Sequence, residues 1–188
     1  MIRYFLLCLI LLTCSVFLQQ WVPSLTENVY NSKLLLVPLV YFCIALAQPY
    51  ISMLIFALIA GCIWDCENIL SPVIAENTLK LENIENLRFG YSIFLFGIFG
   101  ILLKYTQAFF SIKGLRALTP LIAITFILYL LTENLLILFV RGTVPVDHKF
   151  FYQILFTTIY SCIPAPFILL MLSFFWKQFE PRRASYLN

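Results

Sequence analysis

The sequence predicts an all-α integral membrane protein, a six-helix transmembrane bundle in a single domain of residues 1–188. Of its residues, 62% are hydrophobic and only 11% are charged, too few polar groups to cover a water-soluble globule. The apolar residues gather in six runs, at 4–22, 34–47, 50–64, 89–110, 115–140 and 150–176. The net charge of +3 comes from scattered residues, so we expect a lipid bilayer as partner and no nucleic acid.

The first run, 4–22, follows Arg3 and resembles a signal peptide in having a charged start and an apolar stretch. No small-x-small cleavage site follows it, and Gln19-Gln20-Trp21 is typical of an interfacial helix end. We therefore expect a retained first helix, with a cleaved signal peptide as the alternative.

The second and third runs, 34–47 and 50–64, meet at Gln48-Pro49. At 1.5 Å per residue, each helix would reach only about 21 to 23 Å, against a hydrocarbon core of roughly 30 Å. We expect a short hairpin that either crosses the membrane tightly or dips in and returns. Both alternatives place Lys33 and Asp65 on the same side.

The remaining runs carry features of their own. Lys104, near the end of the fourth run, is expected to extend its ammonium group to the interface. Pro164 and Pro166 should kink the sixth run near its middle. Between the third and fourth runs lies an acidic loop, 65–88, for which we expect either a short amphipathic surface helix or an irregular loop.

The basic residues predict that both chain termini are cytoplasmic. With six crossings, the inner side holds seven Lys and Arg residues (Arg3, Lys104, Lys113, Arg116, Lys177, Arg182 and Arg183) against five outside (Lys33, Lys80, Arg88, Arg141 and Lys149). If the hairpin counted as one crossing, the amino terminus would lie outside instead.

Carboxylates within or beside the apolar runs are the main candidates for function. Glu133, in Thr132-Glu133-Asn134 of the fifth run, costs on the order of 2.5 to 3.5 kcal/mol to insert and needs a partner. Counted from Leu115, it falls toward the same outer end as Asp65. The two carboxylates could face one polar pocket; alternatively, Glu133 bonds neighbouring helix groups and Asp65 caps its own helix.

Small residues in the third and fourth runs predict close helix packing. They are Ala57 and Gly61 in the third run and Gly97 and Gly100 in the fourth.

Enzymatic chemistry is not expected, and neither is a cofactor or a metal. His148 is the only histidine, which excludes a two-histidine metal motif. Cys62 and Cys66 lie four residues apart beside Asp65, but a metal site would need more ligands at defined spacing. We interpret them as packing residues.

Taken in order, these elements resemble the family of the bacterial rod shape-determining protein MreD, from Arg3 to about Phe179. The residues that carry the resemblance are Leu34 to Tyr41, Ala45-Leu46-Ala47-Gln48-Pro49, Ala60 to Asp65, Phe89-Gly90-Tyr91, Thr132-Glu133-Asn134 and Pro164-Ala165-Pro166 with its basic tail. The chain departs from the family in the acidic insertion that follows Ser71-Pro72.

The resemblance implies a non-enzymatic scaffold in the bacterial inner membrane. Its partners would be MreC, the actin-like MreB, and the glycosyltransferase and transpeptidase that extend the peptidoglycan wall. The alternative is a substrate-binding subunit of a vitamin transporter of the energy-coupling-factor type, whose six-helix architecture is similar. Those subunits resemble one another in an Ala-rich first helix, whereas run 4–22 contains no Ala or Gly, so we favour the scaffold.

Overall fold

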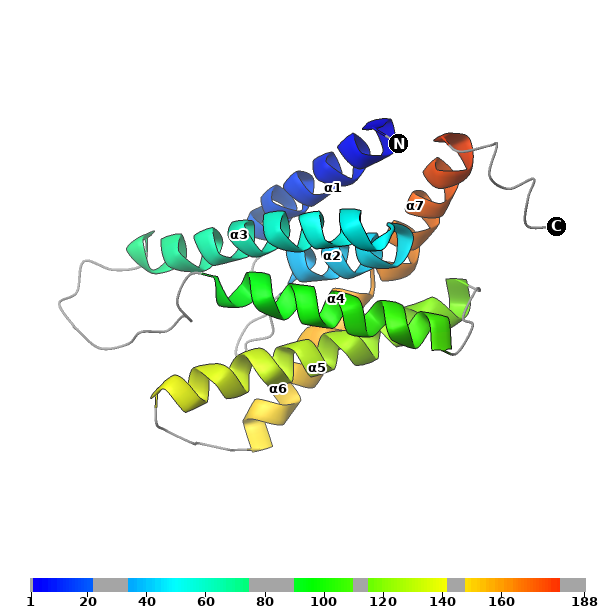
Figure 1. Ribbon diagram of the computed structural model, residues 1–188. Helices are drawn as coiled ribbons and strands as arrows, with labels where there is room; N and C mark the ends of the chain where they lie inside the picture. Colours follow the sequence, from blue (N-terminus) through cyan, green and yellow to red (C-terminus); the bar gives the residue numbers. More distant parts are fainter. Residues whose placement is uncertain (1, 22–33, 75–89, 110–114, 142–147, 180–188) are drawn as a thin grey trace.

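The structure, a computed structural model, describes residues 2–21, 34–74, 90–109, 115–141 and 148–179, and these residues form α-helices joined by short turns. In chain order the helices are α1 (Ile2–Trp21), α2 (Leu36–Ala47), α3 (Tyr50–Ile74), α4 (Tyr91–Phe109), α5 (Leu115–Arg141), α6 (His148–Cys162) and α7 (Ala165–Phe179) (Figure 1). The described part of the chain is therefore all-helical, as predicted.

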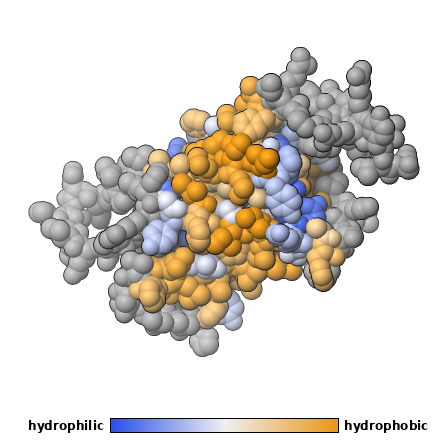
Figure 2. All heavy atoms as spheres, in the orientation of Figure 1, coloured by the Kyte–Doolittle hydropathy of each residue, from blue (hydrophilic) through white to orange (hydrophobic). Residues whose placement is uncertain are grey.

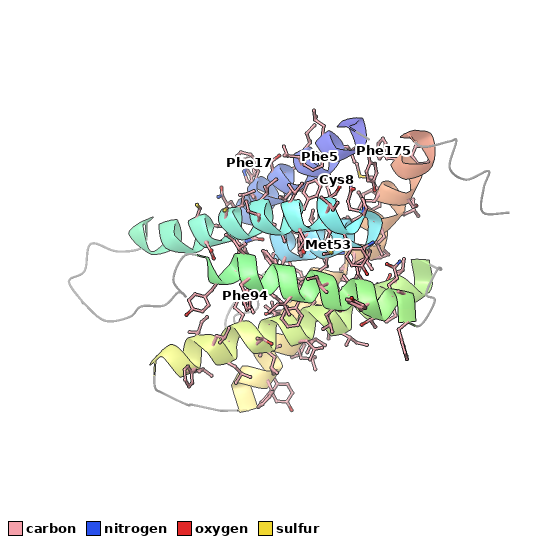
Figure 3. The ribbon with its side chains drawn as sticks, viewed as in Figure 1. Phe5, Cys8, Phe17, Met53, Phe94 and Phe175 are labelled. Carbon is pink, nitrogen blue, oxygen red and sulfur yellow. The ribbon has the colours of Figure 1, made fainter. Side chains whose placement is uncertain are left out.

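Within the described ranges, five segments are long and apolar enough to cross a membrane. They are Tyr4–Trp21, Tyr50–Glu67, Tyr91–Phe109, Leu118–Phe139 and Phe151–Phe175. Large apolar side chains such as Phe17 and Phe94 are mostly exposed (Figure 3). Figure 2 shows hydrophobic residues across the middle of one face, with hydrophilic residues gathered toward either end. The chain has the helices of a multi-pass membrane protein.

The short helix α2 lies at the centre of the bundle. It contacts each of the other six helices, and every residue from Leu36 to Leu46 is buried. Its 12 residues extend only about 18 Å, too little to cross the hydrocarbon core. The expected short first arm of the hairpin is thus present, enclosed by protein rather than by lipid.

The second arm of the hairpin is longer than we predicted. We expected it to end at Trp64, but α3 continues to Ile74 and its 25 residues extend about 37 Å. Asp65 and the residues after it extend the helix instead of ending it, because a single carboxylate near an interface does not interrupt backbone hydrogen bonding. The first ten residues of the acidic loop 65–88 are therefore helical, and the rest lies outside the described residues.

The sixth apolar run is divided into α6 and α7 by a turn at Ile163 and Pro164, where a kink was predicted. Pro164 and Pro166 have no N–H to donate to the carbonyls four residues earlier, so a continuous helix is disfavoured there. Figure 1 shows α1 beginning and α7 ending at the same end of the bundle. We call this end the terminal end, and the opposite end, where α3 ends and α4 begins, the distal end.

Aromatic side chains fill the core between α2, α4 and α5. The rings of Phe96 and Tyr129 stack with centroids 5.2 Å apart, and Phe42 meets both nearly edge-on. Tyr41 is fully buried, and its hydroxyl donates a 2.9 Å hydrogen bond to the Phe96 carbonyl. This cluster fixes α2 against α4 and α5.

Candidate functional site

Asp65 joins α3 to the beginning of α4. Its side chain is only 5% exposed, and Oδ2 accepts a 2.7 Å hydrogen bond from the backbone N–H of Gly90. Gly90 has a φ of 104°, a conformation that residues with a Cβ rarely adopt. A carboxylate is favourable at the amino-terminal end of a helix, where backbone N–H groups point outward. Asp65 thus caps the neighbouring helix α4, whereas the simplest sequence interpretation had it capping its own.

Glu133 is held from a different side by the residue next to Asp65. Its side chain is 9% exposed, and Oε1 accepts a 3.0 Å hydrogen bond from the indole Nε1 of Trp64. Tyr129 lies one turn earlier on α5 and is fully buried. The partner that a carboxylate in an apolar helix requires is therefore supplied by α3.

The two carboxylates lie near each other. Asp65 is adjacent on α3 to Trp64, the residue that donates to Glu133. Trp64, Asp65, Tyr129 and Glu133, which we call the acidic cluster, connect α3, α4 and α5 at the distal end. Both carboxylates are buried and hydrogen bonded, so among the described residues the acidic cluster is a packed junction of three helices.

The two residues that flank Glu133 do not extend this junction. The Thr132 hydroxyl donates to the Leu128 carbonyl and the Asn134 amide donates to the Leu130 carbonyl, both at 2.8 Å and both within α5. Such bonds to the preceding turn are usual for short polar side chains in helices. Of the three consecutive polar residues, only Glu133 is shown bonded to another helix.

A second polar group surrounds the beginning of α2. The side-chain Oε1 of Gln19 accepts from the N–H groups of Leu36 and Val37, at 2.8 and 3.2 Å, and the Ser161 hydroxyl accepts from the Leu35 N–H at 3.0 Å. The next residue, Pro38, has no N–H. The N–H groups that a helix start leaves without internal acceptors are thus satisfied by side chains from α1 and α6.

Gln19 also reaches the distal part of α3. Its Nε2 donates to Glu67 Oε1 at 3.1 Å, two residues beyond Asp65. One side chain therefore holds the end of α1, the beginning of α2 and the end of α3 together. We call Gln19, Ser161 and Glu67 the α2 cap.

At the carboxyl-terminal end of α2, a lysine side chain binds a backbone carbonyl. Lys104 Nζ, from α4, donates to the Leu46 carbonyl at 2.9 Å, while the Gln48 N–H donates to the Ile44 carbonyl. A positive charge is favourable beside the carbonyls that end a helix. Lys104 was expected to extend toward the interface; its ammonium group instead closes the terminal end of α2.

The predicted packing residues differ in what they touch. A Cβ on Gly61 would lie 2.5 Å from the Ile93 Cα, and one on Gly100 would collide with the Tyr41 hydroxyl and lie 3.3 Å from the Met53 sulfur. Ala57 is buried on α3. At Gly97, by contrast, a Cβ would meet nothing within 4 Å, so this glycine takes no part in a close helix contact.

Metal and thiol chemistry find no assembled site in the described part of the chain. No group of three or more His, Cys, Asp or Glu side chains is placed there to hold a metal ion, and Cys62 and Cys66 are both free thiols on α3. What the arrangement offers is two buried, hydrogen-bonded carboxylates at one end of a helical bundle.

Comparison with known proteins adds no relative. No family model, curated protein or solved structure matches the chain.

The sequence identified Asp65 and Glu133 as candidates. It did not identify Trp64, which binds Glu133, or Gln19 and Ser161, which bind the start of α2. Gln19 was interpreted as an interfacial residue, and Ser161 and Trp64 were assigned no role. Pro38 was the available signal, because proline is frequent in the first turn of a helix and indicates that the helix begins near Leu36. Which side chains cap that beginning depends on how α1 and α6 pack, which local sequence does not specify.

Proposed function

We propose that this chain is a non-enzymatic membrane scaffold of the bacterial cell-elongation machinery. It would bind MreC in the inner membrane, with both termini cytoplasmic, and would connect directly or indirectly to MreB and the peptidoglycan glycosyltransferase and transpeptidase. The proposal rests on the ordered resemblance to the MreD family, which includes the segments that end in Asp65 and surround Glu133.

One structural observation supports it above the others. Asp65 and Glu133, from resemblance segments separated by 66 residues, both belong to the acidic cluster at the distal end, opposite the beginning of α1 and the end of α7. A junction of α3, α4 and α5 with buried charge fixes the shape of that end. A rigid end of this kind suits a scaffold, which must present a defined surface to its partners.

Isosteric variants test the contribution of the charges. Asp65→Asn and Glu133→Gln each keep an oxygen that can accept the bond from Gly90 or Trp64, but they remove the negative charge. We expect the double variant to insert and fold, and to retain less than about a third of the MreC captured by the wild type, because charged hydrogen bonds are roughly twice as strong as neutral ones.

The matched control is Thr132→Val, next to Glu133, whose hydroxyl bonds only its own helix. This variant should capture MreC at the wild-type yield. Wild-type capture by the double variant would refute a role for the two charges in binding. The scaffold proposal itself fails if depletion of the protein leaves cell width and wall insertion unchanged, or if a vitamin copurifies in stoichiometric amount.

A further inference from the structure

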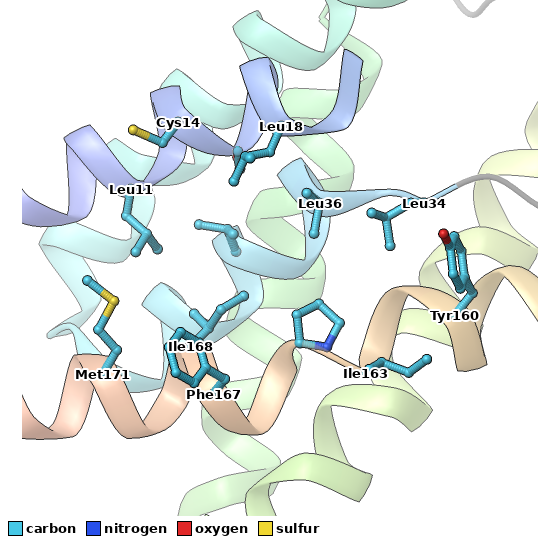
Figure 4. A pocket seen from close by; sticks show the side chains of 13 residues that line it. Leu11, Cys14, Leu18, Leu34, Leu36, Tyr160, Ile163, Phe167, Ile168 and Met171 are labelled. Carbon is cyan, nitrogen blue, oxygen red and sulfur yellow. The ribbon is translucent and has the colours of Figure 1, made fainter. Parts of the chain in front are cut away.

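A cavity of about 510 Å³ lies between α1, the beginning of α2 and the α6–α7 turn (Figure 4). Leu11 and Leu18 line the cavity from α1, Phe167 and Met171 from α7, and Val40 from α2. The acidic cluster does not contribute to it. The lining is almost wholly aliphatic or aromatic, and the cavity is partly open between helices that would lie in the bilayer.

Water is a poor filler for a hollow of this chemistry. Protein interiors are packed to crystal-like density, and apolar cavities exclude water because it finds no hydrogen-bond partners there. The available filler must therefore be apolar. In a bilayer the candidates are a lipid hydrocarbon chain and a helix of another protein.

Size favours the lipid chain. An apolar cavity of about 150 Å³ accommodates benzene, so 510 Å³ has room for roughly 20 carbon atoms at the same volume per atom. A helix is about 10 to 12 Å wide with its side chains and would remain outside such a hollow. Close helix docking also depends on small residues. Among the described residues that line the cavity, the small side chains are Cys14 and Ser15, which are adjacent in sequence and so do not form a pair four residues apart.

The length of the cavity agrees with one leaflet. Leu11 to Leu18 covers about 10 Å of α1, and on the facing side the lining runs from Tyr160 near the end of α6 to Met171 in α7. Half of the hydrocarbon core is about 15 Å. Leu18 lies one turn before the distal end of α1, and Leu11 is at its middle, so the cavity runs from the distal end to mid-depth.

We propose that this cavity binds one hydrocarbon chain of a lipid from the distal leaflet. The chain enters beside Leu34 and Tyr160 and ends between Leu11 and Met171. Binding there fills the gap between α1 and α7 over α2, and so supports the outer side of the shortest helix. The inference does not depend on the scaffold function.

Photolabelling of the full-length protein tests it. The protein is reconstituted in vesicles of phosphatidylethanolamine and phosphatidylglycerol that contain a small share of a phosphatidylcholine with a diazirine near the middle of one chain. After irradiation, labelled residues are located by mass spectrometry. We expect labelling of the cavity walls to exceed that of the exposed α5 side chains Ile124 and Leu128 by about threefold or more, a preference typical of a weak site.

Neighbouring residues provide matched controls. Leu11→Trp and Met171→Trp fill the cavity from opposite walls and should lower its labelling to the level of α5. Ile10→Trp and Leu170→Trp place the same ring on adjacent, lipid-exposed positions outside the lining and should change nothing. Gel filtration and circular dichroism identify any variant that misfolds. If one of the two cavity-filling variants misfolds, the labelling of the other one tests the proposal.

Three results would overturn the proposal. The first is equal labelling of the cavity and α5 in the wild type. The second is unchanged cavity labelling in a folded Leu11→Trp or Met171→Trp variant. The third is cavity labelling that is present in vesicles but absent in native membranes, which would assign the cavity to a partner helix.

Discussion

The two arms of the hairpin, α2 and α3, are joined by Gln48 and Pro49 but occupy opposite environments. α2 is buried along its length, whereas α3 exposes large apolar side chains such as Ile51 and Leu58 to the surroundings of the bundle. α3 is long enough to cross a membrane and α2 is not. The two arms therefore depend on different contacts. α3 needs close packing against α4, and α2 needs hydrogen-bond partners for the backbone groups at its two ends.

The difference shows how a helix that is too short to span can be accommodated. Within hydrocarbon every backbone polar group needs an internal partner, and a helix end has several without one. For α2 these partners are side chains of longer helices: Gln19 and Ser161 at one end, Lys104 at the other. For α3 the decisive feature is the absence of a side chain at Gly61, which lets α4 approach.

Removing the main cap of α2 should have the largest effect. In Gln19→Leu the N–H groups of Leu36 and Val37 lose their acceptor, and each buried donor left unpaired costs about 1 to 3 kcal/mol. We expect the free energy of unfolding to fall by about 3 kcal/mol in total. Titration with denaturing detergent, followed by circular dichroism, measures it. Gln20→Leu, at the neighbouring exposed position, should change the free energy of unfolding by less than about 0.5 kcal/mol. Equal losses in the two variants would mean that the hydrogen bonds of Gln19 to α2 do not contribute to stability.

The close contact of α3 should be next. Gly61→Ala places a methyl group against the Ile93 backbone and should cost about 2 kcal/mol, as overpacking does. Gly97→Ala, which meets open space on α4, should be neutral or slightly stabilising because Ala is the better helix former. The same unfolding titration compares them, and similar losses in both variants would show that α3 and α4 do not depend on close approach at Gly61.

The cationic end of α2 should contribute less than the Gln19 end. Lys104→Met removes the donor to the Leu46 carbonyl and a favourable charge at a helix end, for an expected loss of about 1.5 kcal/mol. Lys104→Gln keeps a donor without the charge and should recover part of it. If the two variants are equally destabilised, the charge rather than the hydrogen bond carries the effect.

The smallest expected effect belongs to Ser161. In Ser161→Ala the Leu35 N–H loses its acceptor, at a cost of about 1 kcal/mol. Ser173→Ala on α7 is the control, because that hydroxyl bonds a carbonyl of its own helix. A thermal melt of both variants should show a lower midpoint for Ser161→Ala alone.

The sequence predicted where the helices lie better than it predicted their ends and their contacts. The apolar runs located the helices, because composition and length alone decide whether a segment can lie in hydrocarbon. The end of α3 was misplaced by ten residues, since Asp65 was taken as a helix end rather than as the cap of the helix that follows. The need of Glu133 for a partner was foreseen, but Trp64 as that partner was not, because a contact between α3 and α5 depends on the packing of the whole bundle.

The α2 cap has a consequence for synthesis. The chain is made from its amino terminus, and Ser161 follows Leu35 by 126 residues. At roughly 5 to 20 residues per second, about 6 to 25 seconds separate the two on the ribosome. During that interval Gln19 is already available and Ser161 is not, so the start of α2 is completed in two steps. The Leu35 N–H at the start of α2 therefore gains its acceptor only after α6 has been made.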